Sequence, residues 1–403
     1  MKGKFCCIVA LLSAFCGKEV WSSEFVVRAQ TIYTVSGPVL KNAALVIENG
    51  RIKKIFTEPY TPPSDAEVLS APVVMPAFID AFSKIGLAEP VNEESSEVTP
   101  DLRVSEVFSP WRKEVRVALW RGITLAHVEP GERNVVGGFC ALVRTWGKTR
   151  KGSVLNPKAS LKAVLGMEPT FGNRGYGWAP PQDIFFRRPT TRMAVARLFR
   201  DSLRRGKEAI SKKRLSAEEH VLLEVVKGKL PLRVHAGRVL DIRIAVREKE
   251  KYGLHLILED AWEAYKVADI IAKEKIPVVL TPDAVGLRLN DPPGERRLNC
   301  ASVLERRGIV LAFGTAGVDV DLRLLASTAV RYGLSEKGAL QALTLNAARI
   351  LGIADQWGSI APGKRADLVL LNGPPLSLST RILYVIGEGR IVYPQKEDRN
   401  GDK

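Results

Sequence analysis

The chain has 403 residues, of which 46% are hydrophobic and 26% are charged, and its formal net charge is +16. This length allows a large buried core and more than one folding unit, and the composition excludes a disordered or fibrous protein. After the N-terminal residues, no run of 18 or more apolar residues predicts a membrane-spanning helix.

The first residues have the order of charged, apolar and small residues that is typical of a secretory signal peptide. A basic start at residues 1–4 precedes an apolar run at residues 5–15, which is too short to cross a bilayer as a helix. We therefore predict a signal peptide over residues 1–22 and an exported protein, periplasmic or extracellular. A lipoprotein processed at Cys16, or an uncleaved anchor, is the alternative.

The cysteine count excludes a disulfide-rich scaffold. Of the five cysteines, Cys6, Cys7 and Cys16 lie within the predicted signal peptide, which leaves Cys140 and Cys300. We predict two buried free thiols.

Much of the positive charge gathers in residues 187–229. A basic surface of this kind can bind nucleic acid or anionic lipid. Glutamates are interspersed here, however, and aromatic residues do not alternate with the basic ones. This pattern favours a solvated helix surface, and we expect no nucleic-acid partner.

Both ends of the chain contain short alternating apolar runs that are separated by turn residues. Residues 25–56 have this pattern, and residues 366–393 repeat it. The pattern between them is different. We therefore predict that residues 24–70 and 357–395 form one composite β-sandwich.

Strands alternate with amphipathic helices between these ends, which predicts parallel strands. The length of the block suits an eight-fold barrel. We predict an α/β fold with a (β/α)8 TIM-like barrel over residues 71–356 and an insertion over its mouth at residues 171–230. Strands are expected at residues 232–234, 256–258, 277–280 and 309–313, and helices at residues 239–252, 261–273, 322–332 and 335–343.

Several segments resemble parts of one enzyme family. Residues 73–87 are similar to its first barrel strand, and residues 343–373 to its closing helix and return into the terminal sheet. The family is the metal-dependent amidohydrolases, in particular the imidazolonepropionase-like branch, and the resemblance covers nearly the whole chain after residue 22. Further matching segments, at residues 98–104, 121–138, 232–238 and 256–269, follow in the family's order.

The resemblance implies a divalent-metal site at the barrel mouth, where a metal-bound water hydrolyses a C–N bond. In the family, two histidines two residues apart on the first strand point into the barrel. Here those positions are Phe82 and Lys84, which do not bind a dication. The sixth-strand histidine is replaced by Asp260. The final aspartate, which is also the family's general base, is replaced by Ala316.

Two of the family's positions keep a residue that can bind metal. His235 matches the fifth-strand histidine, and Glu168 matches the acidic ligand on the fourth strand. The other histidines do not pair at metal-ligand spacing. Asp319 and Asp321 follow the lost aspartate, but the shift changes the face to which they point.

These losses favour a catalytically inactive member of the family, retained as a binding or partner subunit, with no catalytic residue and no cofactor. We expect a homo-oligomer or a hetero-oligomer with an active amidohydrolase paralogue, and no integral membrane segment after signal removal. The alternative is a hydrolase of C–N bonds in which His235, Glu168 and Asp260 hold zinc or another divalent metal at an altered mononuclear site.

A lost metal ion would leave Asp260 and Glu168 as like charges at the barrel mouth, which is costly without compensation. Lys84 has a flexible stem that could carry an ammonium group into the vacated space. We therefore predict that Lys84 pairs with Asp260, Glu168 or both, and that Phe82 fills the remaining volume. In the alternative, Lys84 points to solvent.

Overall fold

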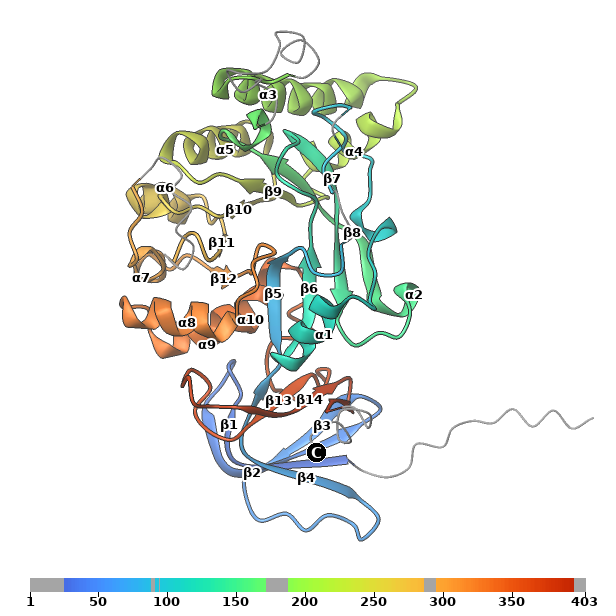
Figure 1. Cartoon of the computed structure of the whole chain (residues 1–403), viewed down its shortest axis with the longest axis vertical. Helices are drawn as coiled ribbons and strands as arrows, with labels where there is room; N and C mark the ends of the chain where they lie inside the picture. Colours follow the sequence, from blue (N-terminus) through green and yellow to red (C-terminus); the bar gives the residue numbers. More distant parts are fainter. Residues whose placement is uncertain (1–24, 88–90, 94, 172–187, 286–294, 395–403) are drawn as a thin grey trace, which may run out of the picture.

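A computed structural model describes residues 25–87, 91–93, 95–171, 188–285 and 295–394. A twisted sheet occupies one end of the molecule, and a barrel surrounded by helices occupies the other (Figure 1). The predicted signal peptide lies outside the described residues. Within them, every helix is too short or too polar to span a bilayer.

Strands from both ends of the chain form one seven-stranded sheet. Its order is β15-β14-β13-β4-β1-β2-β3, so the two ends of the chain meet where β13 pairs antiparallel with β4. The strands are β1 (Phe25–Tyr33), β2 (Val39–Glu48), β3 (Arg51–Phe56), β4 (Glu67–Pro76), β13 (Leu368–Leu371), β14 (Ile382–Gly387) and β15 (Arg390–Tyr393).

The two terminal segments therefore share a sheet, as their common pattern predicted. The two packed sheets of a sandwich are not confirmed, because the topology is that of a single sheet. Strand β4 also runs across the predicted boundary at residue 70 and continues almost directly into the first barrel strand. The sheet is thus tied to the barrel by the chain itself.

A second sheet of eight strands closes into a barrel in sequence order. Across the seam between its first and last strands, the Ala316 N–H donates a hydrogen bond to the Phe82 carbonyl at 2.8 Å, so the barrel is nearly closed. Its strands are β5 (Phe78–Ser83), β6 (Ile123–Val128), β7 (Val136–Arg144), β8 (Val154–Val164), β9 (Leu232–His235), β10 (Leu256–Glu259), β11 (Val278–Leu280) and β12 (Leu311–Phe313).

The prediction that all barrel strands are parallel is wrong for one strand. β7 runs antiparallel to both β6 and β8, whereas the other neighbouring pairs are parallel. A parallel connection needs a crossover of a dozen or more residues, usually a helix. Only residues 129–135 separate β6 from β7, so the chain turns back as a hairpin.

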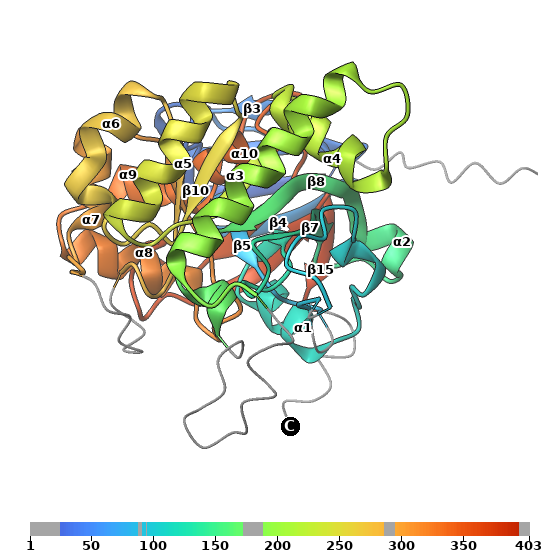
Figure 2. The same cartoon turned by 90° about the horizontal axis from the view of Figure 1, so that it is seen from above.

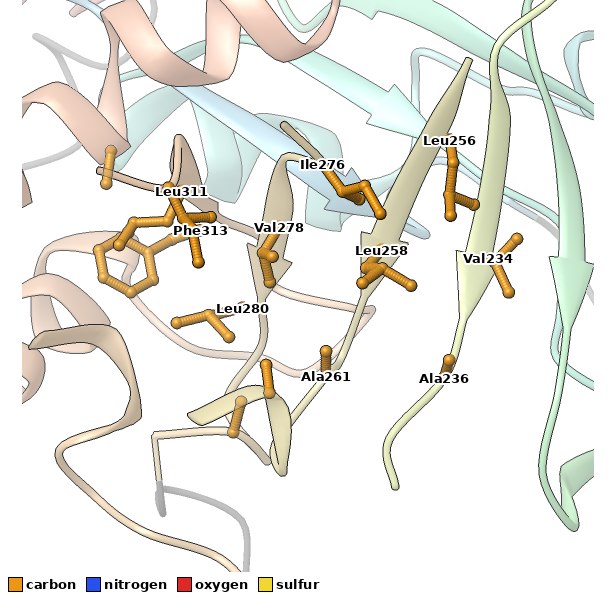
Figure 3. Close-up of a cluster of buried hydrophobic side chains, with 14 of the residues drawn as sticks. Val234, Ala236, Leu256, Leu258, Ala261, Ile276, Val278, Leu280, Leu311 and Phe313 are labelled. Carbon is orange, nitrogen blue, oxygen red and sulfur yellow. The ribbon is translucent and has the colours of Figure 1, made fainter. Parts of the chain in front are cut away.

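Helices cover much of the outside of the barrel (Figure 2). Side chains on one face of β9, β10 and β11, such as Val234, Leu258 and Val278, point toward this layer and form the main apolar core (Figure 3). The alternate side chains point into the barrel. The longer helices are α1 (Lys113–Trp120), α3 (Arg192–Glu208), α4 (Ala217–Val226), α5 (Val239–Tyr252), α7 (Cys300–Arg306), α8 (Leu322–Arg331) and α9 (Glu336–Leu343).

Shorter helices connect these elements. The predicted helix at residues 261–273 is divided into η5 (Ala264–Val267) and α6 (Ala268–Lys273). The closing helix of the resemblance is α10 (Leu345–Ile350), whose apolar residues join those inside the barrel. The others are η1 (Val104–Glu106), α2 (Arg150–Ser153), η2 (Glu168–Thr170) and η4 (Ala209–Ser211).

The basic segment at residues 171–230 forms part of the helical layer where the structure describes it. Helix α3 lies next to α5 and α4 packs against α3 (Figure 2), and α3 buries Val195, Phe199 and Leu203 in the main core. These two helices therefore belong to the layer around the barrel, whereas residues 172–187 of the predicted insertion lie outside the described part. Several of their cations have acidic partners, as in the pairs Arg205–Glu218 and Lys212–Glu219, which fits a solvated helix surface.

The joint sheet predicts a test of the C-terminal segment. Leu370 on β13 is fully buried in the apolar cluster of the seven-stranded sheet, so Leu370→Ala should lower the free energy of unfolding by about 2–5 kcal/mol in urea denaturation. Leu378→Ala is the matched control, because Leu378 is 81% exposed in the same segment. Equal effects of the two substitutions would show that β13 contributes no core to this sheet.

Candidate functional site

A cavity of about 540 Å³ opens at the carboxyl ends of the barrel strands. Parallel strands place the residues at their carboxyl ends around one opening, so positions far apart in sequence meet there. The cavity lining includes all six of the positions that the resemblance selected, Phe82, Lys84, Glu168, His235, Asp260 and Ala316.

His235 ends β9 and is only 5% exposed. Its Nε2 lies 3.8 Å from the Glu168 carboxylate, and neither ring nitrogen has a hydrogen-bond partner among the described residues. Burial opposes a charge on the ring, but the carboxylates of Glu168, Asp260 and Glu132 outweigh it and raise the pKa of His235 to about 9. Because 3.8 Å is too long for a hydrogen bond, this attraction is electrostatic.

Glu168 does not lie on the fourth barrel strand. It begins η2, after β8 has ended, and its side chain is 25% exposed. Burial raises its pKa, but the contact with His235 and backbone hydrogen bonds together outweigh burial, so the pKa of Glu168 is lowered. The carboxylate is therefore charged at neutral pH and faces the imidazole from the rim.

Asp260 follows β10 in a left-handed conformation with φ of 50°. Its side chain accepts a hydrogen bond from the Thr281 hydroxyl. Burial raises the pKa of Asp260 to about 6, although His235 acts in the opposite direction. Asp260 therefore stands close to His235, but it already has a partner on β11.

The position of the family's general base offers no proton acceptor. Ala316 has φ of 51°, and its methyl group takes the place of a carboxylate. The later aspartates do not compensate for this loss. Asp319 pairs with Arg121 at 2.6 Å, and Asp321 accepts a hydrogen bond from the Arg323 N–H at the start of α8.

The prediction for Lys84 is wrong. Its ammonium pairs with Glu132 at 2.7 Å, and each of these side chains is about a quarter exposed. Within the described chain, Lys84 makes no ion pair with Asp260 or Glu168. The reason is that residues 129–135, which turn back between β6 and β7, bring Glu132 to the end of β5.

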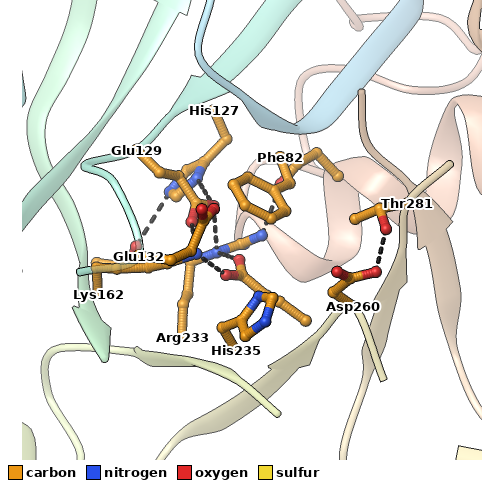
Figure 4. Close-up of polar contacts among 12 residues, drawn as sticks. Phe82, His127, Glu129, Glu132, Lys162, Arg233, His235, Asp260 and Thr281 are labelled. Atoms are coloured by element: carbon orange, nitrogen blue, oxygen red, sulfur yellow. Dashed lines mark hydrogen bonds and ion pairs between the residues drawn. The ribbon is translucent and has the colours of Figure 1, made fainter. Parts of the chain in front are cut away.

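A second set of charges inside the barrel lies beside Phe82 and His235 (Figure 4), and its members are not among the residues that line the cavity. Lys162 on β8 pairs with Glu129 at 2.7 Å and with Glu259 on β10 at 2.5 Å. Arg233 on β9 contacts the same two carboxylates and donates to the Ala81 carbonyl at 2.6 Å. All four charged side chains have no exposed surface. We call Glu129, Lys162, Arg233 and Glu259 the barrel charge cluster.

Mutual attraction favours the charged forms of Glu129, Lys162 and Arg233 in the barrel charge cluster. Burial opposes each charge, but Glu129 and Glu259 outweigh it and raise the pKa of Lys162. Lys162 and Arg233 in turn lower the pKa of Glu129 below its usual value. Phe82 lies beside the cluster, with its ring centroid 4.0 Å from the Lys162 nitrogen. The side chain at the first family ligand position thus contacts an ammonium group.

His127 borders the barrel charge cluster in a satisfied environment. Its Nδ1 lies 2.9 Å from Glu129, and its Nε2 lies 3.0 Å from the Ser160 hydroxyl. Burial and the charges of Arg233 and Lys162 lower the pKa of His127 well below its usual value. The ring is therefore neutral at pH 7 and orients Glu129.

The residues present do not fit the metal site that the fold implies. In the described chain, the His, Cys, Asp or Glu donors that gather in threes within 4.8 Å of one another are His127, Glu129 and Cys140. Glu129 is occupied by two cations, and burial raises the pKa of the Cys140 thiol well above its usual value. His235, Glu168 and Asp260 do not form such a group. Lys162 would repel a dication in the space between Glu129 and Glu259.

Sequence reasoning missed the barrel charge cluster, although a signal was present. Lys162, Arg233 and Glu259 each interrupt a short apolar strand, at SLKAV, LRVH and LILE. A charged residue in a strand that is buried on both faces must have a partner.

Cys140 and Cys300 are free and buried, as predicted.

An eight-stranded barrel with its polar site at the carboxyl ends of the strands defines the class of α/β barrel proteins. Comparisons with known proteins specify the family. Residues 233–395 match the model of the amidohydrolase family. An amidohydrolase structure from Thermotoga maritima matches with a TM-score of 0.83 and 27% identity, covering 92% of this chain and 100% of that one.

Curated relatives match over shorter stretches. The imidazolonepropionase of Cereibacter sphaeroides (strain ATCC 17029) is 29% identical over 167 residues, which are 40% of this chain and 41% of that protein. Adenine deaminase 2 of Rhizobium meliloti (strain 1021) is 56% identical over 63 residues, 16% of this chain and 10% of that protein. The chain thus spans about two fifths of the imidazolonepropionase and a tenth of the adenine deaminase. It belongs to the amidohydrolase superfamily.

The raised pKa of His235 predicts how stability depends on pH. Protonated His235 stabilises the folded chain fully below pH 6.5, and this contribution is lost as the pH rises toward 9. It amounts to about 3 kcal/mol. The variant His235→Asn should lack this loss in urea denaturation between pH 6.5 and 9. The control His220→Asn, at an exposed position on α4, should behave as the wild type. Parallel curves for all three proteins would contradict the assignment.

Proposed function

We propose that this chain is a non-hydrolytic member of the amidohydrolase superfamily that works as a ligand-binding or partner subunit. The observation that carries the proposal is the barrel charge cluster, in which a lysine ammonium lies between two carboxylates and against the side chain at the first family ligand position. A site of this composition neither attracts nor coordinates a dication.

The chemistry of hydrolysis also lacks a proton acceptor. Metal-assisted hydrolysis needs an activated water and a base to remove its proton. Ala316 stands at the position of the general base. Of the aspartates that follow it, Asp319 pairs with Arg121, and Asp321 accepts a hydrogen bond from the Arg323 N–H. The proposal therefore assigns binding, and no bond cleavage, to the cavity at the barrel mouth.

The cavity itself is suited to a small polar molecule. It combines aromatic and apolar walls, at Phe171 and Trp262, with charged groups of both signs such as Arg238 and Asp283. Pockets of this size with a few polar groups are typical of small-molecule sites. Export through the N-terminal signal and assembly with an active paralogue complete the proposal, and no nucleic-acid partner is included.

One observation favours the alternative, a mononuclear metal hydrolase. In the part of the chain that the structure describes, both nitrogens of His235 lack a hydrogen-bond partner although the ring is buried. A metal ion or a ligand can use such a nitrogen, with Glu168 and Asp260 as the nearest acids. The hydrogen bond from Thr281 to Asp260, and the absent base at Ala316, favour the binding role.

Metal analysis separates these functions. Protein purified without chelators, and a sample dialysed against zinc, should each contain far less than one metal ion per chain by inductively coupled plasma mass spectrometry. Adenine and imidazolonepropionate, taken from the names of the relatives, should not turn over. About one bound metal per chain, together with turnover, would establish the hydrolase.

Restoring the first-strand histidines should not restore activity. The double variant Phe82→His and Lys84→His supplies two imidazoles, but Lys162 remains between the carboxylates and Ala316 still offers no base. We expect no zinc-dependent turnover of either compound above the wild-type background. Zinc-dependent hydrolysis by this variant would show that the two missing histidines are the only defect.

A further inference from the structure

The barrel charge cluster has the arrangement of a cation site that the chain fills with its own side chain. We infer that the Lys162 ammonium is the resident cation of this barrel, and that removing it creates an anionic cavity which a small alkylammonium ion can occupy. This inference deepens the proposed function and rests on it, because a chain with a metal ion at this place would already hold a cation.

The contacts of Lys162 are those of a bound ion. Its nitrogen lies 2.7 Å from an oxygen of Glu129 and 2.5 Å from an oxygen of Glu259, and the Phe82 ring centroid is 4.0 Å away. Two charge-assisted hydrogen bonds and a cation–π contact satisfy a primary ammonium in a dry site. The side chain has no exposed surface, so bulk solvent does not reach the ammonium.

The positions on the strands explain why both carboxylates are needed. Lys162 and Arg233 are direct partners in the register of β8 and β9, so two like charges lie side by side on the inner face. Glu129 and Glu259 each contact both cations. The four charges therefore sum to zero. Without Lys162, the two carboxylates would share Arg233 alone, and a buried negative charge would be uncompensated.

The groups around Lys162 have their own partners and would leave its space open. His127 is held by Glu129 and Ser160, and Arg233 donates through Nη2 to the carbonyl of Ala81, although its buried Nη1 has no hydrogen-bond partner among the described residues. Truncation to alanine removes three methylene groups and the ammonium. The vacated space therefore has the size and chemistry of n-propylammonium, with two carboxylate oxygens at its inner end.

The test compares Lys162→Ala with Lys84→Ala. Lys84 is the matched control. Like Lys162, it is a lysine that lies near Phe82, but it pairs with one glutamate instead of two, and its side chain is a quarter exposed. The unfolding midpoint of Lys162→Ala should fall by about 5 °C or more, and that of Lys84→Ala by about 2 °C or less. Adding n-propylammonium chloride before refolding should raise the midpoint of Lys162→Ala, and not that of the control or the wild type. The uncharged isostere n-propanol should have no such effect.

A charge-balanced variant keeps the test decisive if Lys162→Ala does not fold. Lys162→Met leaves the excess negative charge, whereas Lys162→Met with Glu259→Gln removes one charge of each sign. The double variant should therefore unfold at a higher temperature than Lys162→Met alone. Three results overturn the inference: a wild-type midpoint for Lys162→Ala, equal effects of propylammonium and propanol, or a double variant no more stable than Lys162→Met.

The proposed function fails by a different result. About one metal ion per chain in the wild-type protein, with turnover, would overturn the non-hydrolytic function whatever the variants do. A metal-free wild type whose Lys162 variants show no charge-specific rescue would overturn only the inference about the resident cation.

Discussion

The four buried charges of the barrel charge cluster must balance one another inside the nearly closed barrel. A single ion costs several kcal/mol when it is moved from water to a protein interior, and the cost is offset only by close partners of opposite charge. The strands β8, β9 and β10 place Lys162, Arg233 and Glu259 on the inner face, and Glu129 enters from the end of β6. Each buried charge is compensated by the opposite charges that it contacts.

This arrangement gives the barrel mouth a different electrostatic setting from that of a metal site. The positive charge of the Lys162 ammonium does not line the cavity and is covalently attached to the chain, so it cannot exchange with ions in the solvent. At the cavity, His235 is close to the carboxylates of Glu168 and Asp260, and its ring nitrogens have no hydrogen-bond partner within the described chain. The scaffold of the superfamily is retained, and we propose that the cation filling the interior decides the chemistry at its carboxyl-terminal face.

The sequence predicted the large features because each was specified by a local pattern. Alternating strands and helices predicted the barrel, similar patterns at both ends predicted a shared sheet, and the order of family segments brought six positions to one cavity. The partner of Lys84 could not be predicted, because it depends on where the turn carrying Glu132 lies in space. The reversed direction of β7 was missed because periodicity does not report strand direction. Lys162 was missed because a lysine on a strand is ordinarily exposed, and only its neighbours show that it is not.

Anomalous diffraction at the zinc absorption edge, from crystals of the wild-type protein grown with zinc, tests directly whether Lys162 or a metal ion occupies the barrel. We predict no anomalous peak among Glu129, Glu259 and Phe82, and density for the Lys162 side chain between the two carboxylates. An anomalous peak in that space, with Lys162 displaced from Glu129 and Glu259, would show that the barrel holds a metal ion after all.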